Sequence, residues 1–253
     1  MEPGVGVEAG FCVAIPMYNE EGNAESCVRA LSPVLEGTRF RTQLLVVDDG
    51  SRDDTASILR RLQEQFRLLR VVTHRENEGY GASVRTAVAE ALAAGFGYVL
   101  FMDSDLTNDP KYIEPFVHKM EQGCQVIKAS RYVAGGGMDA VPPHRMLISR
   151  TGNYVARHLM GVPITDCTNG FRAVRTDLLR RMPLTELGFP VIMEELYHAK
   201  RLATHFCEIP YVLTSRGRDK GFSKFSYSPM TFWAYFKYVL RGAFVRLLPN
   251  LDR

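Results

Sequence analysis

YVLFMDSDLTNDP, residues 98–110, is the stretch that decides how this sequence is interpreted. An apolar run ends there in Asp103 and Asp105, two carboxylates two positions apart. If the strand continues through them, alternation sends both side chains to the same side. Like charges held close are costly unless a cation neutralises them, and Mg²⁺ and Mn²⁺ prefer carboxylate oxygens. We therefore expect a divalent cation here, although Asp-x-Asp alone is common and Asn108 or Asp109 before Pro110 also makes a good helix cap.

The first half of the chain alternates apolar strands with helices. Strands are expected at residues 11–16, 44–49 and 69–73 and in the run that ends at Asp103, with helices between them. Continuous apolar strands that alternate with helices predict a mostly parallel sheet covered on both faces. The fold class is therefore α/β, a Rossmann-like single domain, and its ligands are expected at the carboxyl ends of the strands.

Acidic and polar residues follow three of these strands. They are PMYNEE at residues 16–21, DDGSRDDT at 48–55 and DSDLTND at 103–109. Each segment alone can be explained as a turn or a helix cap. Three such clusters at one edge of a parallel sheet predict a shared ligand site.

The second half of the chain is less regular. We expect a strand running into a glycine loop at 125–137, a helix at 145–160, a strand at 166–176, a helix at 189–203 and a strand at 205–213. A basic loop follows at 214–226, and an aromatic helix begins at Pro229. We divide the chain into a main domain, 1–228, and a C-terminal amphipathic helix, 229–253.

Composition limits the classes of function. The 253 residues are 46% apolar and carry a formal charge of +3. The sequence has no dense basic run of the kind that indicates nucleic-acid binding. The five cysteines are scattered and the six histidines lack ligand spacing, so we expect reduced cysteines and structural histidines. No apolar run approaches the roughly 20 residues that span a bilayer, and the N-terminus does not resemble a signal peptide. The expected location is cytoplasmic, with any membrane attachment peripheral, at the cytoplasmic face.

Seven motifs together resemble glycosyltransferase family 2, which has the GT-A fold, and within it the polyprenol (dolichyl) phosphate mannose synthases. They are IPMYNEEGN, VVDDGSRDDT, RENEGYGASVRTA, FMDSDL, ASRYVAGGG, DCTNGFRA and RDKGFSK. The resemblance implies a metal-dependent inverting transferase that moves mannose from GDP-mannose to a polyprenyl phosphate at a membrane surface, with Mg²⁺ or Mn²⁺ as cofactor.

The resemblance also implies roles for individual residues. Those expected around the nucleotide sugar are Pro16, Tyr18, Glu20, Val46, Asp48, Met102, Ser104 and Thr107. Those expected to act in catalysis are Asp103 and Asp105, which would hold the metal, with Arg131, Arg218 and Lys224. The acceptor phosphate is assigned to Arg131, Arg145 and Ser149. Thr107 departs from the family pattern, which has Gln at that position and uses it near the metal.

The acceptor determines whether a general base is needed. A phosphate monoester is already ionised near neutral pH, so it needs cations to position it, and Arg150 could join the acceptor arginines. A sugar hydroxyl would need a base, for which Glu194 and Asp166 are the candidates. For Glu195 we favour an ion pair with Arg or Lys, and Asp166 could instead orient Arg172.

Other interpretations stay open from the sequence. The donor could be UDP-glucose or UDP-N-acetylglucosamine, and the acceptor a lipid phosphate or a glycan. A non-catalytic nucleotide-binding subunit or a nucleotidyltransferase would also combine such a sheet with acidic loops. The C-terminal helix carries one apolar stripe with flanking cations, which fits either a membrane interface or packing onto its own domain.

Overall fold

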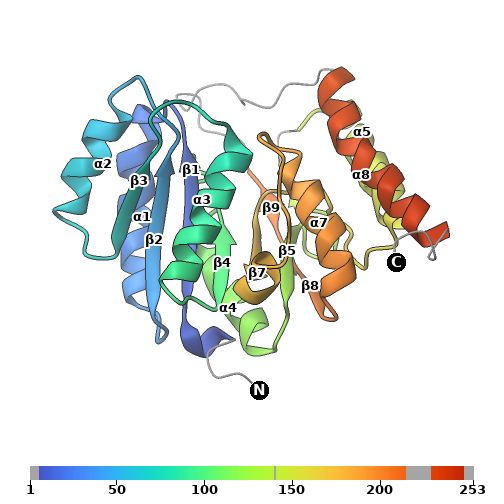
Figure 1. The fold of residues 1–253 in the computed structure, drawn as a ribbon, viewed down its shortest axis with the longest axis horizontal. Helices are drawn as coiled ribbons and strands as arrows, with labels where there is room; N and C mark the ends of the chain where they lie inside the picture. The colour runs from blue at the N-terminus through green and yellow to red at the C-terminus, as the bar shows by residue number, and fades with distance from the viewer. Residues whose placement is uncertain (1–5, 140, 215–228, 248–253) are drawn as a thin grey trace.

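The computed structural model describes residues 6–139, 141–214 and 229–247, and it is built around a seven-stranded sheet (Figure 1). The strand order is β3-β2-β1-β4-β7-β5-β8. The strands are β1 (Phe11–Met17), β2 (Thr42–Asp48), β3 (Leu69–Thr73), β4 (Tyr98–Phe101), β5 (Val126–Ser130), β7 (Arg172–Arg175) and β8 (Phe206–Pro210). All pair in parallel except β7, which is antiparallel to β4 and β5. The predicted α/β fold with a mostly parallel sheet is confirmed.

Helices cover both faces of the sheet, as the continuous apolar strands predict. The helices are α1 (Glu21–Glu36), α2 (Thr55–Gln63), α3 (Tyr80–Ala93), α4 (Ile113–Glu121), α5 (Pro143–Met160), α6 (Thr176–Leu179), α7 (Val191–Leu202) and α8 (Pro229–Leu247). Short 3-10 helices lie at Val7–Ala9 and Pro110–Tyr112, and β6 (Gly137–Met138) pairs with β9 (Val212–Leu213). Phe11, Val13 and Ile15 of β1 enter the core shared with α1, α2 and α4. Cys12 and Ala14 point to the other face, into the core shared with α3, α6 and α7.

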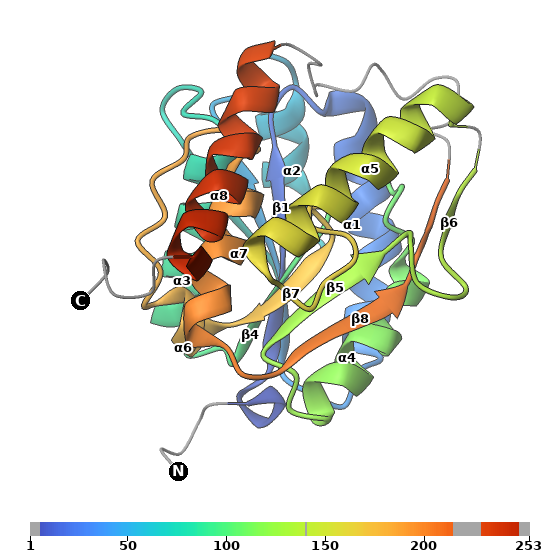
Figure 2. The same ribbon diagram turned by 90° about the vertical axis from the view of Figure 1, so that its right-hand side faces the viewer.

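The C-terminal helix is present and packs beside α5 and α7 (Figure 2). Tyr238 and Val239 of α8 are buried in a third apolar cluster with Ala156 and Met160 of α5 and Met193 of α7. One face of α8 is therefore part of the folded domain. In the described part of the chain, no helix combines the length and apolar character needed to cross a membrane.

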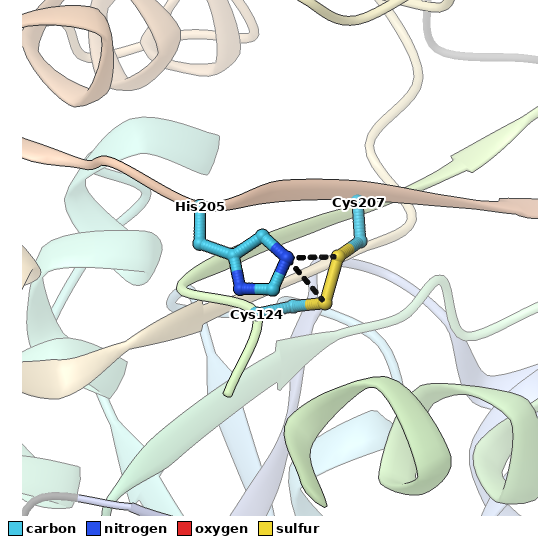
Figure 3. Close-up of side chains that lie close together, drawn as sticks. All are labelled: Cys124, His205 and Cys207. Atoms are coloured by element: carbon cyan, nitrogen blue, oxygen red, sulfur yellow. Dashed lines mark hydrogen bonds between the residues drawn. A yellow bond between two sulfur atoms is a disulfide. The ribbon is translucent and has the colours of Figure 1, made fainter. Parts of the chain in front are cut away.

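The cysteines differ from the sequence-based expectation. Cys124 and Cys207 form a disulfide, so the prediction that all five cysteines are reduced is wrong for this pair (Figure 3). The two positions are 83 residues apart, and they meet because β5 and β8 are parallel neighbours. Local spacing carries no signal of such a contact. Cys12, Cys27 and Cys167 are free and buried.

A buried ion pair joins the centre of the sheet to α7. Arg172 of β7 is fully buried and donates to both carboxylate oxygens of Glu195, Nε at 2.6 Å and Nη2 at 2.8 Å. Its guanidinium also donates to the carbonyl of Gly170 and lies 4.2 Å from the ring centre of Phe101 on β4. The expectation that Glu195 pairs with a cation is confirmed.

We expect Glu195→Ala to lower the free energy of unfolding by about 3 to 5 kcal/mol, because it leaves the buried charge of Arg172 uncompensated. Glu90→Ala is the control, since its ion pair with Arg70 is largely exposed and such pairs contribute about 0 to 1 kcal/mol. Urea denaturation of both variants measures the difference. Equal losses would contradict a structural role for the buried pair.

Candidate active site

The loops after β1 and β2 meet at the carboxyl edge of the sheet, as predicted. Asn19 donates its backbone N–H to Ser51 Oγ at 2.9 Å, and its side-chain oxygen accepts from the N–H of Arg52 at 2.9 Å. The carboxylate of Asp53 accepts from the N–H of Glu21. The two acidic loops therefore hold each other in place and form one wall of the site.

The residues expected around a nucleotide differ in their exposure to solvent. Pro16, Tyr18 and Glu20 are partly exposed at the end of β1. Val46 is fully buried in the core, so it lies beneath the surface that a nucleotide would contact. Asp48 accepts from the N–H of Ser51, whereas its Oδ2 is buried and has no hydrogen-bond partner in the described residues. A buried carboxylate oxygen without a partner is costly, and a bound hydroxyl could satisfy it.

Asp49 organises the loop between β3 and α3, which sequence reasoning missed. Its Oδ1 contacts His74 Nδ1 at 2.8 Å and accepts from the N–H of Glu78, and its Oδ2 accepts from the N–H of Gly79. His74 contacts Thr86 Oγ1 through its other ring nitrogen. His74 thus has the structural role expected for it. The signal in the sequence was the second Asp of the DDGS turn, Asp49, which directly follows the Asp assigned to the nucleotide.

Asp103 and Asp105 lie in a turn, because β4 ends at Phe101. The expectation that strand alternation places both side chains is therefore wrong. Asp105 Oδ1 accepts from the N–H of Thr107 at 3.0 Å and from its hydroxyl at 2.6 Å. Asn108 accepts from the N–H of Asp103 at 2.7 Å. The loop closes on itself through these short polar side chains, and the Thr107 hydroxyl orients Asp105.

The donor set of this turn fits a hard cation. Asp105 is buried, Asp103 is partly exposed, and both present carboxylate oxygens at the edge where the acidic loops gather. Mg²⁺ and Mn²⁺ favour such oxygen donors. Met102 and Ser104, also assigned to the nucleotide, flank Asp103 in the chain and are both buried.

Arg131 follows β5 and is held by Asp166. Nε donates to Oδ2 at 2.7 Å and Nη2 to Oδ1 at 2.8 Å, a two-point contact. Burial acts to lower the pKa of Arg131, but the hydrogen bonds and charge of Asp166 outweigh it and the pKa is raised. The suggestion that Asp166 orients Arg172 is wrong, since Asp166 holds Arg131 instead.

Glu194 also has a structural partner. Its carboxylate accepts from the N–H and hydroxyl of Thr185 and from the N–H of Glu186, at 2.6 to 3.0 Å. These contacts fix the loop that precedes α7. Asp166 is paired with Arg131 and Glu195 with Arg172. All three carboxylates that the sequence offered as bases or ion-pair partners therefore have structural partners.

A cavity of about 690 Å³ opens beside Asp103, between α5 and α8. Its polar lining includes Arg131, Arg145, Ser149, Asn153 and Thr168, and its apolar lining includes Ile148, Met193, Trp233, Phe236 and Val239. The three residues assigned to the acceptor phosphate are therefore brought together, and Ser149 Oγ contacts the hydroxyl of Tyr132 at 2.6 Å. Arg150 is exposed and is not among the lining residues. Arg218 and Lys224 lie outside the described residues.

Lys128 is buried beneath this cavity. Its Nζ donates to the carbonyls of Cys167 and Asn169, which belong to the loop before β7. Burial, and then the neighbouring charge of Arg172, lowers the pKa of Lys128 from the ordinary 10.5 to about 8. Lys128 therefore supports the loop that carries Asp166 and Thr168.

The lowered pKa predicts a pH dependence of stability. Between pH 8 and 10.5 the unfolded chain binds a proton at Lys128 that the folded chain does not bind. The contribution of this group to stability therefore rises with pH across that window. We expect Lys128→Met to show a smaller rise than the wild type in urea unfolding between pH 8 and 10. The control is Lys200→Met on the exposed side of α7, and equal slopes for all three proteins would refute the assignment.

A mostly parallel sheet with ligand loops at its carboxyl edge is typical of enzymes that bind nucleotides. Residues 12–182, more than half of the chain, match the family model described as Glycosyl transferase family 2. The chain belongs to this family and is a glycosyltransferase.

Two curated relatives agree with the resemblance inferred from the motifs. Dolichol-phosphate mannosyltransferase of Pyrococcus furiosus is 29% identical over 233 residues, which cover 90% of this chain but 62% of that protein. The chain thus spans less than two thirds of that relative. Polyprenol monophosphomannose synthase of Mycolicibacterium smegmatis is 30% identical over 218 residues, covering 85% of this chain and 80% of that protein.

The fold is also similar to that of a solved structure. The crystal structure of glucosyl-3-phosphoglycerate synthase from Mycobacterium tuberculosis in complex with UDP superposes with a TM-score of 0.63 at 22% identity. The match covers 95% of this chain and 81% of that one. The expected fold class, a GT-A domain, is confirmed.

Proposed function

We propose that this glycosyltransferase moves mannose from GDP-mannose to a polyprenyl phosphate, with inversion at the sugar carbon. The cavity beside Asp103 is the observation that carries the proposal. It combines two arginines and a serine hydroxyl with apolar walls from α5 and α8. Such a lining suits an acceptor with an anionic head and an apolar tail. The names of the two curated relatives support mannose as the sugar and a polyprenyl-type lipid phosphate as the acceptor.

The allocation of carboxylates supports a phosphate acceptor. Each candidate base already has a structural partner. Asp166 pairs with Arg131 and Glu195 with Arg172. Glu194 accepts hydrogen bonds from Thr185 and Glu186. A phosphate oxygen needs no general base, because it is ionised near neutral pH. It forms a bond to the anomeric carbon while the bond from that carbon to the diphosphate breaks on the opposite side. Arg145 and Arg131 would offset the repulsion between the two anions.

Asp103 and Asp105 would hold Mg²⁺ or Mn²⁺ on the donor side. When bound, such a cation neutralises charge on the departing diphosphate. A glucosyl-3-phosphoglycerate synthase of the same fold has been crystallised with Mn²⁺ and UDP-glucose. On the nucleoside side, the buried Oδ2 of Asp48 could accept from a ribose hydroxyl. Arg218 and Lys224, in the basic loop, are proposed to close over the diphosphate.

We expect Asp105→Asn to lower turnover by more than about 100-fold, since it weakens both the cation site and the charge stabilisation of the leaving group. Asp109→Asn, in the same loop but capping the next helix through Lys111, is the matched control. The measurement is transfer from GDP-mannose at increasing Mg²⁺ and Mn²⁺, compared with EDTA. Full activity of Asp105→Asn at low metal would remove the metal assignment.

The acceptor is tested with a pair of arginines on α5. Arg145 lines the cavity and Arg150 does not. We expect Arg145→Ala to lower kcat/KM for a short polyprenyl phosphate by about tenfold or more, a loss typical of a charge-assisted hydrogen bond, and Arg150→Ala to leave it nearly unchanged. Donor affinity, measured by calorimetry, should stay constant in both variants.

The same assay separates the alternatives. GDP-mannose, UDP-glucose and UDP-N-acetylglucosamine are compared as donors, and polyprenyl phosphate, polyprenol and a soluble glycan as acceptors. Preference for GDP-mannose with polyprenyl phosphate supports the proposal. An unphosphorylated polyprenol that serves equally well would overturn the phosphate acceptor and return Asp166 or Glu194 to the role of base.

We also propose that α5 and α8 meet a membrane surface, at its cytoplasmic face, where the lipid acceptor resides. Large apolar side chains on both helices are exposed, namely Leu147, Ile148, Tyr154, Val155 and Leu159 on α5 and Trp233, Phe236, Leu240 and Phe244 on α8. Exposed cations, including Arg145, Arg241 and Arg246, lie on the same helices. Aromatic and basic side chains together are typical of interfacial helices.

The membrane proposal predicts a loss of vesicle binding when apolar side chains are removed. Because burying one large apolar side chain contributes about 1.5 to 3 kcal/mol, Trp233→Ser combined with Phe244→Ser should weaken binding by more than about tenfold. Co-sedimentation with anionic phospholipid vesicles measures it. Val34→Ser, an exposed apolar position on α1, is the control. Unchanged binding of the double variant would contradict the proposed surface.

A further inference from the structure

A second cluster of metal-ligating side chains lies at the amino ends of the strands, the end opposite to the candidate active site. Cys124 lies shortly before β5, His205 directly precedes β8, and Cys207 is the second residue of β8 (Figure 3). His205 Nε2 is 3.9 Å from Cys124 Sγ and 3.7 Å from Cys207 Sγ. Among the described residues these three form a group whose ligand atoms all lie within 4.8 Å of one another. They sit at the amino ends of the strands, whereas Asp103 and Asp105 follow a carboxyl end.

The positions of the three atoms fit a tetrahedral zinc site. With Zn–S near 2.3 Å and Zn–N near 2.0 to 2.1 Å, a tetrahedron places sulfur about 3.5 Å from nitrogen and the two sulfurs about 3.8 Å apart. The imidazole is already near that spacing from both sulfurs. His205 directly precedes β8 and Cys207 is its second residue, and the imidazole of His205 lies beside the sulfurs of both cysteines. Only the two sulfurs must separate, and their α-carbons are 5.9 Å apart.

Hydrogen bonds hold the backbone of this cluster in place. Gln125 Oε1 accepts from the N–H groups of Thr204 and His205, at 2.7 and 3.2 Å. The carbonyl of His205 accepts in turn from the N–H of Gln125 at 2.8 Å. Tyr98 donates its hydroxyl to the carbonyl of Cys124 at 2.9 Å. A cation would therefore find the ligands arranged in advance.

The chemistry of the donors selects a cation different from that of the active site. Two thiolates and an imidazole are softer donors than carboxylates and suit Zn²⁺ instead of Mg²⁺. His205 is exposed and Cys207 is half-buried, so a cation can enter from solvent. Three protein ligands leave a fourth position for water.

We propose that Cys124, His205 and Cys207 bind a soft divalent cation of the zinc type when the cysteines are reduced, and that the disulfide is the metal-free state of the same site. Binding releases the two thiol protons as the thiolates coordinate the cation. An oxidising disulfide such as oxidised glutathione takes two electrons from the two thiolates and leaves as two thiolates of its own. The Cys124–Cys207 bond forms and the cation is released.

The test uses the full chain, reduced with a phosphine, freed of metal and titrated with Co²⁺ and then Zn²⁺. We expect one equivalent of Co²⁺ to give a thiolate-to-metal absorption band together with the visible bands of a tetrahedral site, and Zn²⁺ to displace it. Cys207→Ala should lower zinc affinity by more than about 100-fold. Even the loss of a residue that only hydrogen-bonds to a metal ligand lowers metal affinity by about 10 to 100-fold. His205→Ala should lower it by at least about tenfold, by the same comparison.

Two controls identify the site. Cys167→Ala removes a free cysteine outside the cluster and should keep the band, and Asp105→Asn should keep it as well. Circular dichroism confirms that each variant is folded. Adding oxidised glutathione to the zinc-loaded protein should release one equivalent of Zn²⁺ to a chromogenic chelator as two thiols disappear. The absence of a thiolate band from the reduced wild type, or wild-type affinity in Cys207→Ala, would overturn the proposal.

Discussion

The reversed direction of β7 is the constraint on which the site depends. β7 lies between β4 and β5 and runs antiparallel to both, so its first residue reaches the edge where the parallel strands end. The loop before it, which contains Asp166 and Thr168, is thereby delivered beside Arg131. Arg172 at the start of β7 is anchored by Glu195. If β7 ran parallel to its neighbours, this loop would lie at the far edge of the sheet.

Beneath the cavity the strands carry buried cations in place of apolar side chains. Lys128 of β5 is paired in register with Arg172 of β7, and both are almost fully buried. Buried charges are tolerated only when they are paired or hydrogen-bonded, and these two use Glu195 and loop carbonyls. These hydrogen bonds offset the desolvation cost of the two buried charges, and those of Lys128 also hold the loop above them. Stability and site geometry are therefore linked through the same side chains.

The elements that could be predicted from the sequence are those set by local pattern. β3 was expected at residues 69–73 and occupies Leu69–Thr73, and β1 differs by one residue at its end. The convergence of the acidic loops follows from parallel pairing alone. The insertion of β7, the Arg131–Asp166 contact and the Cys124–Cys207 contact were not predicted, because each joins residues that are distant in sequence. β4 stops two residues early because Asn108 takes the N–H of Asp103, which a strand would have used.

The two edges of the sheet differ in the kind of donor that they present. The carboxyl edge gathers carboxylates and backbone N–H groups, which suit hard cations and phosphates. The amino edge of β5 and β8 presents sulfur and imidazole, which suit soft cations. Affinity alone does not keep Zn²⁺ away from carboxylates, because a given site binds Zn²⁺ more tightly than Mn²⁺, so the cation at each edge depends on donor type together with the supply of each metal. Zinc that is held by thiolates at the amino edge is no longer free to compete for the carboxylates of Asp103 and Asp105, where we propose that Mg²⁺ or Mn²⁺ binds.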